Sequence, residues 1–309
     1  MSTPAYHLRT NKAVDRLLFL ETIKRLVRYA EIGKYKYYGF GGPYLDDFRL
    51  LHENFPDMEL TSIERDENVL KRQRFHLPNS KIKLINKEMG DFIANESFDD
   101  SKCIFWLDYT QLRYSQYSEF RAVLERVASG SIIKITLLAN SKYYGKKDKQ
   151  EEFKKYFGDI LPISSIPIPE NPKEFCFLLQ KMLKIVAERA LPSYASSRYF
   201  QPLTSFFYKD GQTMFTFTGV VIEKEEKDEI KNKYNTWIHA NLEWSEPVQI
   251  SLPFLSIKER LWLEEILPCS PKNLCERLGY KIESKNNEEQ MKQYCDFYRE
   301  YPYFIKGFL

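Results

Sequence analysis

The sequence predicts a doubly wound α/β fold, in which helices cover both faces of a mostly parallel sheet. Strand-like and helix-like stretches alternate from residue 35 to residue 139, at the spacing of strand–helix–strand units. Later in the chain, PLTSFFYKDGQTMFTFTGVVI predicts two strands joined at Asp210-Gly211. A hairpin that closes an otherwise parallel sheet implies an antiparallel edge strand.

An N-terminal helix is predicted from Asn11 to Gly33, because apolar residues recur there at helical spacing, with Asn11 as its N-cap. The strands and helices of the sheet then follow in alternation. Strands are expected at 35–40, 59–63, 82–85, 103–107 and 132–139, and helices at 44–54, 66–75 and 117–128.

The remainder of the chain is predicted to be mainly helical apart from the hairpin. A long helix over 174–190 precedes the hairpin, and Ser256-Ile-Lys-Glu259 is a capping box that begins another helix. Two more helices are expected at 271–278 and 287–301. Three parts result: an N-terminal helix (1–34), a sheet domain (35–222) and a helical C-terminal module (223–309).

Composition excludes several classes of protein. With 309 residues, 43% of them hydrophobic, the chain is neither a disordered tail nor a disulfide-stapled miniprotein. The net charge of +3 does not indicate a nucleic-acid or membrane partner. Five scattered cysteines without a CxxC pair are expected to be reduced thiols of a cytoplasmic protein. The four histidines have no metal-ligand spacing, so no metal site is expected, and no apolar run is long enough to cross a membrane.

Glycine is scarce, yet three of the 12 glycines, Gly39, Gly41 and Gly42, lie together between a predicted strand and a predicted helix. Such a turn lets the backbone pass close to a ligand and directs its N–H groups toward it. A tight turn without a ligand is the alternative. Pro43 and its neighbours stand where a dinucleotide fingerprint has a third glycine, so a nucleoside is favoured over the dinucleotide of a nicotinamide-dependent dehydrogenase.

Acidic residues follow two further strands. Glu64, after the second strand, can accept hydrogen bonds from both hydroxyls of a ribose, although a helix cap or a surface salt bridge is an alternative. Gly90-Asp91-Phe92 follows the third strand, where the acid can bind an adenine amino group and the aromatic ring can stack on the base. The alternative for Asp91 is an N-cap.

Asp108 ends the apolar run CIFWLD, at the edge where open α/β sheets bind their ligands. It could orient a substrate, bind a cation or act as a base. A buried acid that is hydrogen-bonded to a neighbouring loop is the alternative.

In this order, Tyr38-Gly39-Phe40-Gly41-Gly42, Glu64, Gly90-Asp91-Phe92 and Asp108 resemble the motif series of class I S-adenosylmethionine-dependent methyltransferases, over roughly residues 35–222. The resemblance implies a seven-stranded Rossmann-like sheet with an antiparallel C-terminal hairpin. It also implies that S-adenosylmethionine is the cofactor. The glycine turn (Gly39, Gly41, Gly42) would then hold its methionine part, Glu64 its ribose and Asp91 with Phe92 its adenine, while Asp108 would lie near the transferred methyl group.

The expected function is therefore methyl transfer to an unknown acceptor. Oxygen is favoured, because Asp108-Tyr109-Thr110-Gln111 does not match the Asn/Asp-Pro-Pro-Tyr motif of enzymes that methylate amino groups of DNA. The alternative is a catalytically silent methyltransferase-fold subunit that regulates or scaffolds a multi-protein system, such as a bacterial defence system. It rests on Tyr37, which stands where the family has an acid, and on the aromatic residues from Tyr301 onward.

Partners are expected at two segments besides the acceptor site. Residues 250–309 are a candidate surface for a protein partner. The segment 142–156 interleaves lysines with aromatic residues, which suits nucleic-acid binding. Its acidic residues favour a solvated loop and helix start instead, and no membrane partner is expected.

Overall fold

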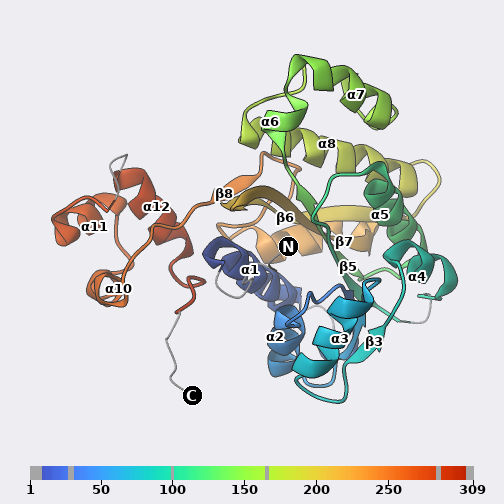
Figure 1. The fold of residues 1–309 in the computed structure, drawn as a ribbon, viewed down its shortest axis with the longest axis horizontal. Coiled ribbons are helices and arrows are strands. Elements are labelled where there is room, and N and C mark those ends of the chain that lie inside the picture. The colour runs from blue at the N-terminus through green and yellow to red at the C-terminus, as the bar shows by residue number, and fades with distance from the viewer. Residues whose placement is uncertain (1–8, 27–30, 99–100, 164–166, 283–286, 304–309) are drawn as a thin grey trace. The chain divides into compact units, whose positions relative to one another are not determined.

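The computed structural model describes residues 9–26, 31–98, 101–163, 167–282 and 287–303. These residues form one sheet of eight strands in the order β3-β2-β1-β4-β5-β7-β6-β8 (Figure 1). β1 to β5 are parallel and β7 is antiparallel to β5, so the predicted doubly wound fold is confirmed, with one short strand added. The strands are β1 (Lys36–Gly39), β2 (Glu59–Ile63), β3 (Lys83–Ile85), β4 (Cys103–Asp108), β5 (Ile132–Leu138), β6 (Arg198–Asp210), β7 (Gln212–Glu223) and β8 (Val248–Ile250).

The predicted helices occur in the predicted order, with differences at residues 89–95, 141–157 and 33, and residues 89–95 form a further helix. Residues 141–157, predicted as a loop and a helix start, form two helices, α6 and α7. Gly33 does not end the first helix but lies in a short 3₁₀ helix, Ile32–Lys34. The helices are α1 (Thr10–Leu26), α2 (Asp46–Asn54), α3 (Glu67–His76), α4 (Met89–Asn95), α5 (Tyr114–Arg126), α6 (Ser141–Tyr144), α7 (Lys147–Phe157), α8 (Pro172–Ala190), α9 (Lys227–Tyr234), α10 (Ile257–Glu264), α11 (Pro271–Leu278) and α12 (Asn287–Phe297).

The register of the parallel strands determines which loops meet. β1 lies between β2 and β4, and its last residue, Gly39, is paired with Ser62 on one side and Trp106 on the other. The carboxyl ends of these three strands therefore share one edge of the sheet. The chain order reverses between β1 and β4, and open α/β sheets bind ligands at such a reversal.

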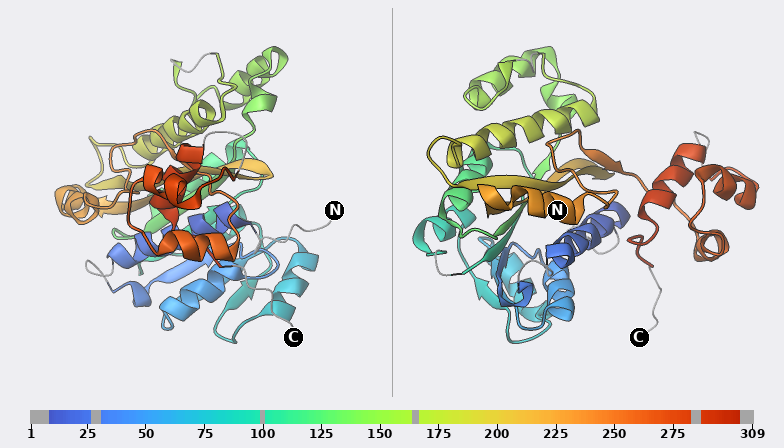
Figure 2. Two further views of the ribbon diagram at one scale, coloured as in Figure 1. Left: turned by 90° about the vertical axis from the view of Figure 1, so that its left-hand side faces the viewer. Right: turned by 180° about the vertical axis from the view of Figure 1, so that it is seen from behind.

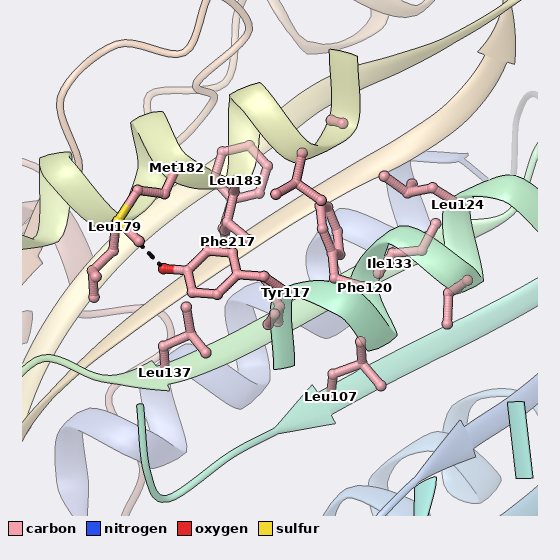
Figure 3. Close-up of a cluster of buried hydrophobic side chains, with 14 of the residues drawn as sticks. Leu107, Tyr117, Phe120, Leu124, Ile133, Leu137, Leu179, Met182, Leu183 and Phe217 are labelled. Carbon is pink, nitrogen blue, oxygen red and sulfur yellow. Dashed lines mark hydrogen bonds between the residues drawn. The ribbon is translucent and has the colours of Figure 1, made fainter. Parts of the chain in front are cut away.

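Helices cover both faces of the sheet (Figures 1 and 2). On one face, α4, α5 and α8 pack on apolar side chains of β4, β5 and β7. In Figure 3, Tyr117 and Phe120 of α5 lie between the strand residues and α8, and the Tyr117 hydroxyl points toward the Met182 sulfur, 3.9 Å away. On the other face, Phe48 of α2 packs on Tyr37 of β1. Side chains of the flanking helices thus pack against the strands on both faces.

The chain divides into two compact units, one of residues 19–207 and 212–248 and the other of residues 1–18, 208–211 and 249–309. These boundaries differ from the expected ones at 34 and 222, since α9 belongs to the unit that contains most of the sheet. Asn11 is not an N-cap: it lies within α1 and donates a hydrogen bond of 2.9 Å to Asp210, a residue of the same unit.

The C-terminal helices of the second unit have a core of their own. Arg260 is 3% exposed and lies over the rings of Tyr301 and Tyr303. Its guanidinium donates to the carbonyls of Tyr301 and Pro302, at 2.9 and 2.8 Å. Five apolar or aromatic side chains around it are fully buried: Leu263, Leu274, Met291, Tyr294 and Phe297.

Replacing Phe120 by alanine tests the packing of α5 between the sheet and α8. Phe120 is fully buried, and its removal leaves a cavity, so we expect a loss of about 3–5 kcal/mol in the free energy of unfolding. Urea unfolding followed by circular dichroism measures this loss. Ser118→Ala, at an exposed position of the same helix, is the control, with a change within about 0.5 kcal/mol. Equal unfolding midpoints for the two variants would contradict the packing described.

Candidate functional site

The glycine turn follows β1 and has a backbone that favours glycine. Gly41 and Gly42 have φ angles of 70° and 53°. A Cβ atom on Gly41 would lie 2.5 Å from Cδ2 of Leu45, so a larger residue there would displace the start of α2. A Cβ atom on Gly42 would meet no described atom within 4 Å, so this part of the turn faces open space.

A buried glutamine on α3 holds the turn. The side-chain amide of Gln73 donates to the carbonyl oxygens of Phe40 and Gly42, at 2.8 and 2.9 Å. The Ser62 hydroxyl, at the end of β2, lies 3.0 Å from the Phe40 carbonyl and 3.1 Å from Oε1 of Gln73. Gln73 and Ser62 are both fully buried, so water does not compete for these bonds.

These bonds determine where the N–H groups of the turn point. In a trans peptide the C=O and the N–H point in opposite directions. Because the Phe40 carbonyl is held toward α3, the N–H of Gly41 points away from it. The Gly41 carbonyl accepts a hydrogen bond of 3.0 Å from the N–H of Leu45, so the N–H of Gly42 points away from α2. The turn thus directs two donors away from its supporting helices.

Tyr37 brings a carboxylate close to the glycine turn. Its buried ring packs edge-on against Phe48, with ring centroids 5.0 Å apart. Its hydroxyl donates a hydrogen bond to Asp47 in the first turn of α2. The hydroxyl oxygen also lies 2.7 Å from the position that a Cβ atom of Gly39 would occupy. The tip of Tyr37, with Asp47 bonded to it, is therefore beside the first glycine of the turn.

Glu64 lies directly after β2, half-buried at the same edge. Its Oε1 accepts a hydrogen bond of 2.7 Å from the main-chain N–H of Asp66. Burial raises the pKa of the Glu64 carboxyl above its ordinary value, while the hydrogen bond from Asp66 acts in the opposite direction. The half-buried carboxylate is thus partly removed from water.

The alternative roles considered for Glu64 are filled by other residues. Asp66 caps α3, because its side chain accepts hydrogen bonds from the N–H groups of Asn68 and Val69. Arg65 forms its ion pair with Glu88, at 3.0 Å. Lys71 pairs with Glu67 within α3. Neither a helix cap nor one of these ion pairs explains an acid at position 64.

Gly90, Asp91 and Phe92 lie in the first turn of α4, not in a turn before it. The side chain of Asp91 is exposed, and Glu88 occupies the N-cap position considered for it. Phe92 is 2% exposed, and its ring packs against Tyr38. The ring of Phe92 therefore belongs to the core under α4, which corrects its expected role as a surface on which a base stacks.

Asp108 is the last residue of β4 and is half-buried. It lies two residues beyond Trp106, which is paired with Gly39. Side chains two residues apart in a strand lie on one face, so Asp108 leaves the sheet on the same face as Trp106. The next strand supports this end of β4, because Asp108 is paired with Thr136 of β5. Asp108 and the glycine turn thus lie on either side of the reversal in strand order.

Tyr109 follows Asp108 and connects the glycine turn to α5. Its ring packs against that of Phe40, with centroids 5.4 Å apart. Its hydroxyl donates a hydrogen bond to Glu119 of α5. Burial raises the pKa of Glu119 above its ordinary value, and the bond from Tyr109 acts in the opposite direction.

The structure therefore brings the glycine turn, Glu64 and Asp108 to the ends of three adjacent strands, with Asp91 on the helix that follows β3. Five supporting residues were not singled out in the sequence: Asp47, Ser62, Gln73, Tyr109 and Glu119. Two features of the sequence could have identified Gln73 and the two acids, Asp47 and Glu119. Gln73 follows buried Leu70 by three residues on the inner face of α3, and each tyrosine precedes its acid by ten residues.

Other candidate features lie outside this edge. On α7, Lys149 and Lys154 of the lysine-rich segment pair with Glu152 and Glu151, both at 2.7 Å. In the described part of the chain, no group of three His, Cys, Asp or Glu side chains could hold a metal ion. No helix among the described residues is long and apolar enough to cross a membrane. A surface depression lined by Glu125 and residues 190–192 and 195–198 lies beside the start of β6, at the opposite edge of the sheet.

A family model described as "Putative O-methyltransferase" matches residues 4–308. The chain belongs to this family. The fold is that of a class I methyltransferase, with the parallel strands and the antiparallel hairpin that the motif series implied. No curated protein matches the sequence.

Three solved structures are distantly similar to this chain. LepI, solved in complex with SAM, is 11% identical over 65% of this chain and 46% of its own, with a TM-score of 0.39. The N-methyltransferase NodS from Bradyrhizobium japonicum is 9% identical over 68% of this chain and 97% of its own, with a TM-score of 0.39. PigF, solved with SAH, is 9% identical over 63% of this chain and 60% of its own, with a TM-score of 0.35. The chain spans about half the length of LepI.

Replacing Gln73 by leucine tests the support of the glycine turn. The near-isosteric change leaves the Gly42 carbonyl and part of the Ser62 network without a partner, so we expect about 1–3 kcal/mol less unfolding free energy. Chemical denaturation measures this. Arg74→Ala, at the next and exposed position of α3, is the control and should change little. A Gln73→Leu protein as stable as the wild type would show that the turn does not depend on this amide.

Replacing Glu64 by glutamine tests the cost of burying its charge. A raised pKa in the folded state favours folding at low pH, and this contribution is lost as the pH rises through the folded pKa. The unfolding free energy of the wild type relative to Glu64→Gln should therefore fall between pH 4 and pH 7, as measured by denaturation at several pH values. Glu67→Gln, at an exposed site, should show no such trend. An opposite trend for Glu64→Gln would mean that its charge is stabilised in the fold.

Proposed function

We propose that this chain transfers the methyl group of S-adenosylmethionine to an oxygen atom of its acceptor. The observation that carries the proposal is the convergence of the glycine turn, Glu64 and Asp108 at the carboxyl ends of β1, β2 and β4. A nucleoside with a charged amino-acid tail needs a bare backbone with N–H donors, an acceptor for its ribose hydroxyls and a nearby polar group at the reacting atom. These groups occur here at adjacent strand ends.

The residues of this edge fit the cofactor part by part. The turn at Gly41 and Gly42 directs N–H donors away from its supporting helices and is open at Gly42, which suits the methionine carboxylate. Glu64 uses Oε1 for the main chain of Asp66, and we assign its Oε2 to the ribose hydroxyls. The loop and first turn that carry Asp91 and Phe92 are assigned to the adenine.

Little side-chain chemistry is needed for the transfer. The bound cofactor supplies an activated methyl group, because its sulfonium is a good leaving group. The protein then has to hold the acceptor oxygen in line and to remove its proton where it carries one. We assign both tasks to Asp108, because it leaves the sheet beside the glycine turn. The helices of residues 250–303 are proposed to recognise the acceptor or a protein partner.

The geometry around Tyr37 favours an active enzyme over a silent subunit. The silent alternative rests on Tyr37 at the position of the family's acid. Here the Tyr37 hydroxyl is bonded to Asp47 beside Gly39, so a carboxylate is close to the turn despite the replacement. We assign this carboxylate to balance the ammonium group of the methionine part.

Titration calorimetry with S-adenosylmethionine on the full chain tests the proposal. We expect the wild type to bind, and Asp108→Asn to bind with similar affinity but to transfer a labelled methyl group about 10²-fold more slowly or worse. The transfer assay uses S-adenosylmethionine labelled in the methyl group, with cell lysate as the source of acceptor. Asp57→Asn, at an exposed position before β2, is the control and should match the wild type. A folded wild-type protein that binds no cofactor would refute the proposal.

A further inference from the structure

The exposed side of α10 is largely apolar. The exposed side chains of this helix and its C-cap residue are Ile257, Lys258, Leu261, Trp262 and Glu265. Residues four positions apart lie on the same side of a helix, so these five form one continuous arc, called here the α10 arc. Ile257, Leu261 and Trp262 are 49%, 55% and 46% exposed. A surface helix ordinarily has polar residues in such positions, so this composition is typical of a contact surface.

The opposite side of α10 is fixed in the core of the C-terminal helices. Arg260 and Leu263 are buried there. Glu264 accepts a hydrogen bond of 3.1 Å from the hydroxyl of Tyr294, which belongs to α12. The helix could not turn the α10 arc inward without breaking these contacts. Whatever covers the arc must therefore come from outside this group of helices.

Trp262 is held in position on the α10 arc. Its indole N–H donates to the main-chain carbonyl of Arg277 on α11 at 3.3 Å, and the Arg277 guanidinium lies 3.4 Å from the centroid of the indole ring. Arg277 also forms an ion pair with Glu265, at 2.5 Å. An aromatic side chain that is already ordered loses little conformational entropy on binding. Trp262 is thus an aromatic anchor of the kind that dominates many protein interfaces.

The charges of the α10 arc are complementary to the same arc in the reverse direction. Lys258 lies in the first turn and forms no ion pair within the described part of the chain. Glu265 lies about 10 Å further along the helix, and its side chain is 58% exposed despite its contact with Arg277. An antiparallel pair of identical helices can be centred between Leu261 and Trp262. Lys258 then faces the partner's Glu265, because the two positions are equally far from that centre.

We propose that the α10 arc is a homodimer interface, in which the helices of two copies of this chain pack antiparallel about a two-fold axis between Leu261 and Trp262. In a two-fold interface each contact occurs twice, so Lys258 pairs with the partner's Glu265 at both ends. The apolar residues between these ends are removed from water. A second copy of the chain always supplies the matching pattern of charge.

This inference names the protein partner suggested for the C-terminal helices and stands apart from methyl transfer, because α10 and the glycine turn belong to different compact units. The helix is short, since it has only eight residues. Two turns of helix bury less than the roughly 800 Å² per partner of a standard interface, so we expect association at micromolar concentrations.

Sedimentation velocity of the full chain, over about a hundredfold range of micromolar concentrations, tests this interface. The wild type should shift from the mass of one chain to that of two as the concentration rises. Leu261→Asp places an unpaired charge at the apolar centre and should weaken the association at least about tenfold. Lys292→Glu, at an exposed position of α12, is the control and should associate like the wild type.

Charge reversal distinguishes the two-fold arrangement from other contacts. Lys258→Glu alone and Glu265→Lys alone should each self-associate at least about tenfold more weakly, because like charges then face each other at both ends. An equimolar mixture of these two variants should associate again, because both contacts are then between opposite charges. Circular dichroism checks that each variant is folded.

The inference is overturned if the wild type remains monomeric over the whole range, which would mean that another protein or the rest of the same chain covers the α10 arc. Dimers that Leu261→Asp does not weaken would also overturn it, since they would form through another face. A mixture of the two charge variants that associates no better than either variant alone would exclude the antiparallel two-fold arrangement.

Discussion

The proposed site depends on one buried amide. Gln73 donates to two carbonyls of the glycine turn, which leaves the sheet before α2 begins. The amide fixes the direction of the neighbouring peptide groups and therefore of the donors at Gly41 and Gly42. An unpaired carbonyl in this position would carry a desolvation cost comparable to a lost hydrogen bond. The conformation of the turn is thus a property of α3 as much as of its own residues.

Two phenol–carboxylate pairs connect strand ends to the helices that follow them. Tyr37 of β1 is bonded to Asp47 of α2, and Tyr109 after β4 is bonded to Glu119 of α5. Each pair joins two elements that are consecutive in the chain. The two pairs lie on opposite faces of the sheet. Each also leaves a carboxylate near the edge where the cofactor is proposed to bind. The same bonds therefore contribute to packing and set the charge of the site, and both pairs lie within the unit that contains most of the sheet.

The sequence predicted the main elements of the sheet well because their signals are local. The boundaries of β2 are those predicted, and the capping box at Ser256 is formed as predicted. Gly90-Asp91-Phe92 was expected in a turn, because the polar residues before Gly90 resemble a loop. The helix in fact begins at Met89 and includes all three residues. Phe92 was expected at the surface of the site, but its spacing in α4 turns it toward Tyr38 and the core. Local pattern does not distinguish these two positions.

The sequence by itself determined the α/β class, the strand order along the chain, the glycine turn and the acids that end β2 and β4. These features depend on residue type and short-range periodicity. Only the tertiary structure decided which groups support and charge the site. Asp47 and Glu119 each bond a tyrosine ten positions earlier, and Gln73 bonds Phe40, 33 positions earlier, because neighbouring parallel strands bring α3 beside the glycine turn. Local sequence patterns predict the helices and strands but not which of their side chains meet in space.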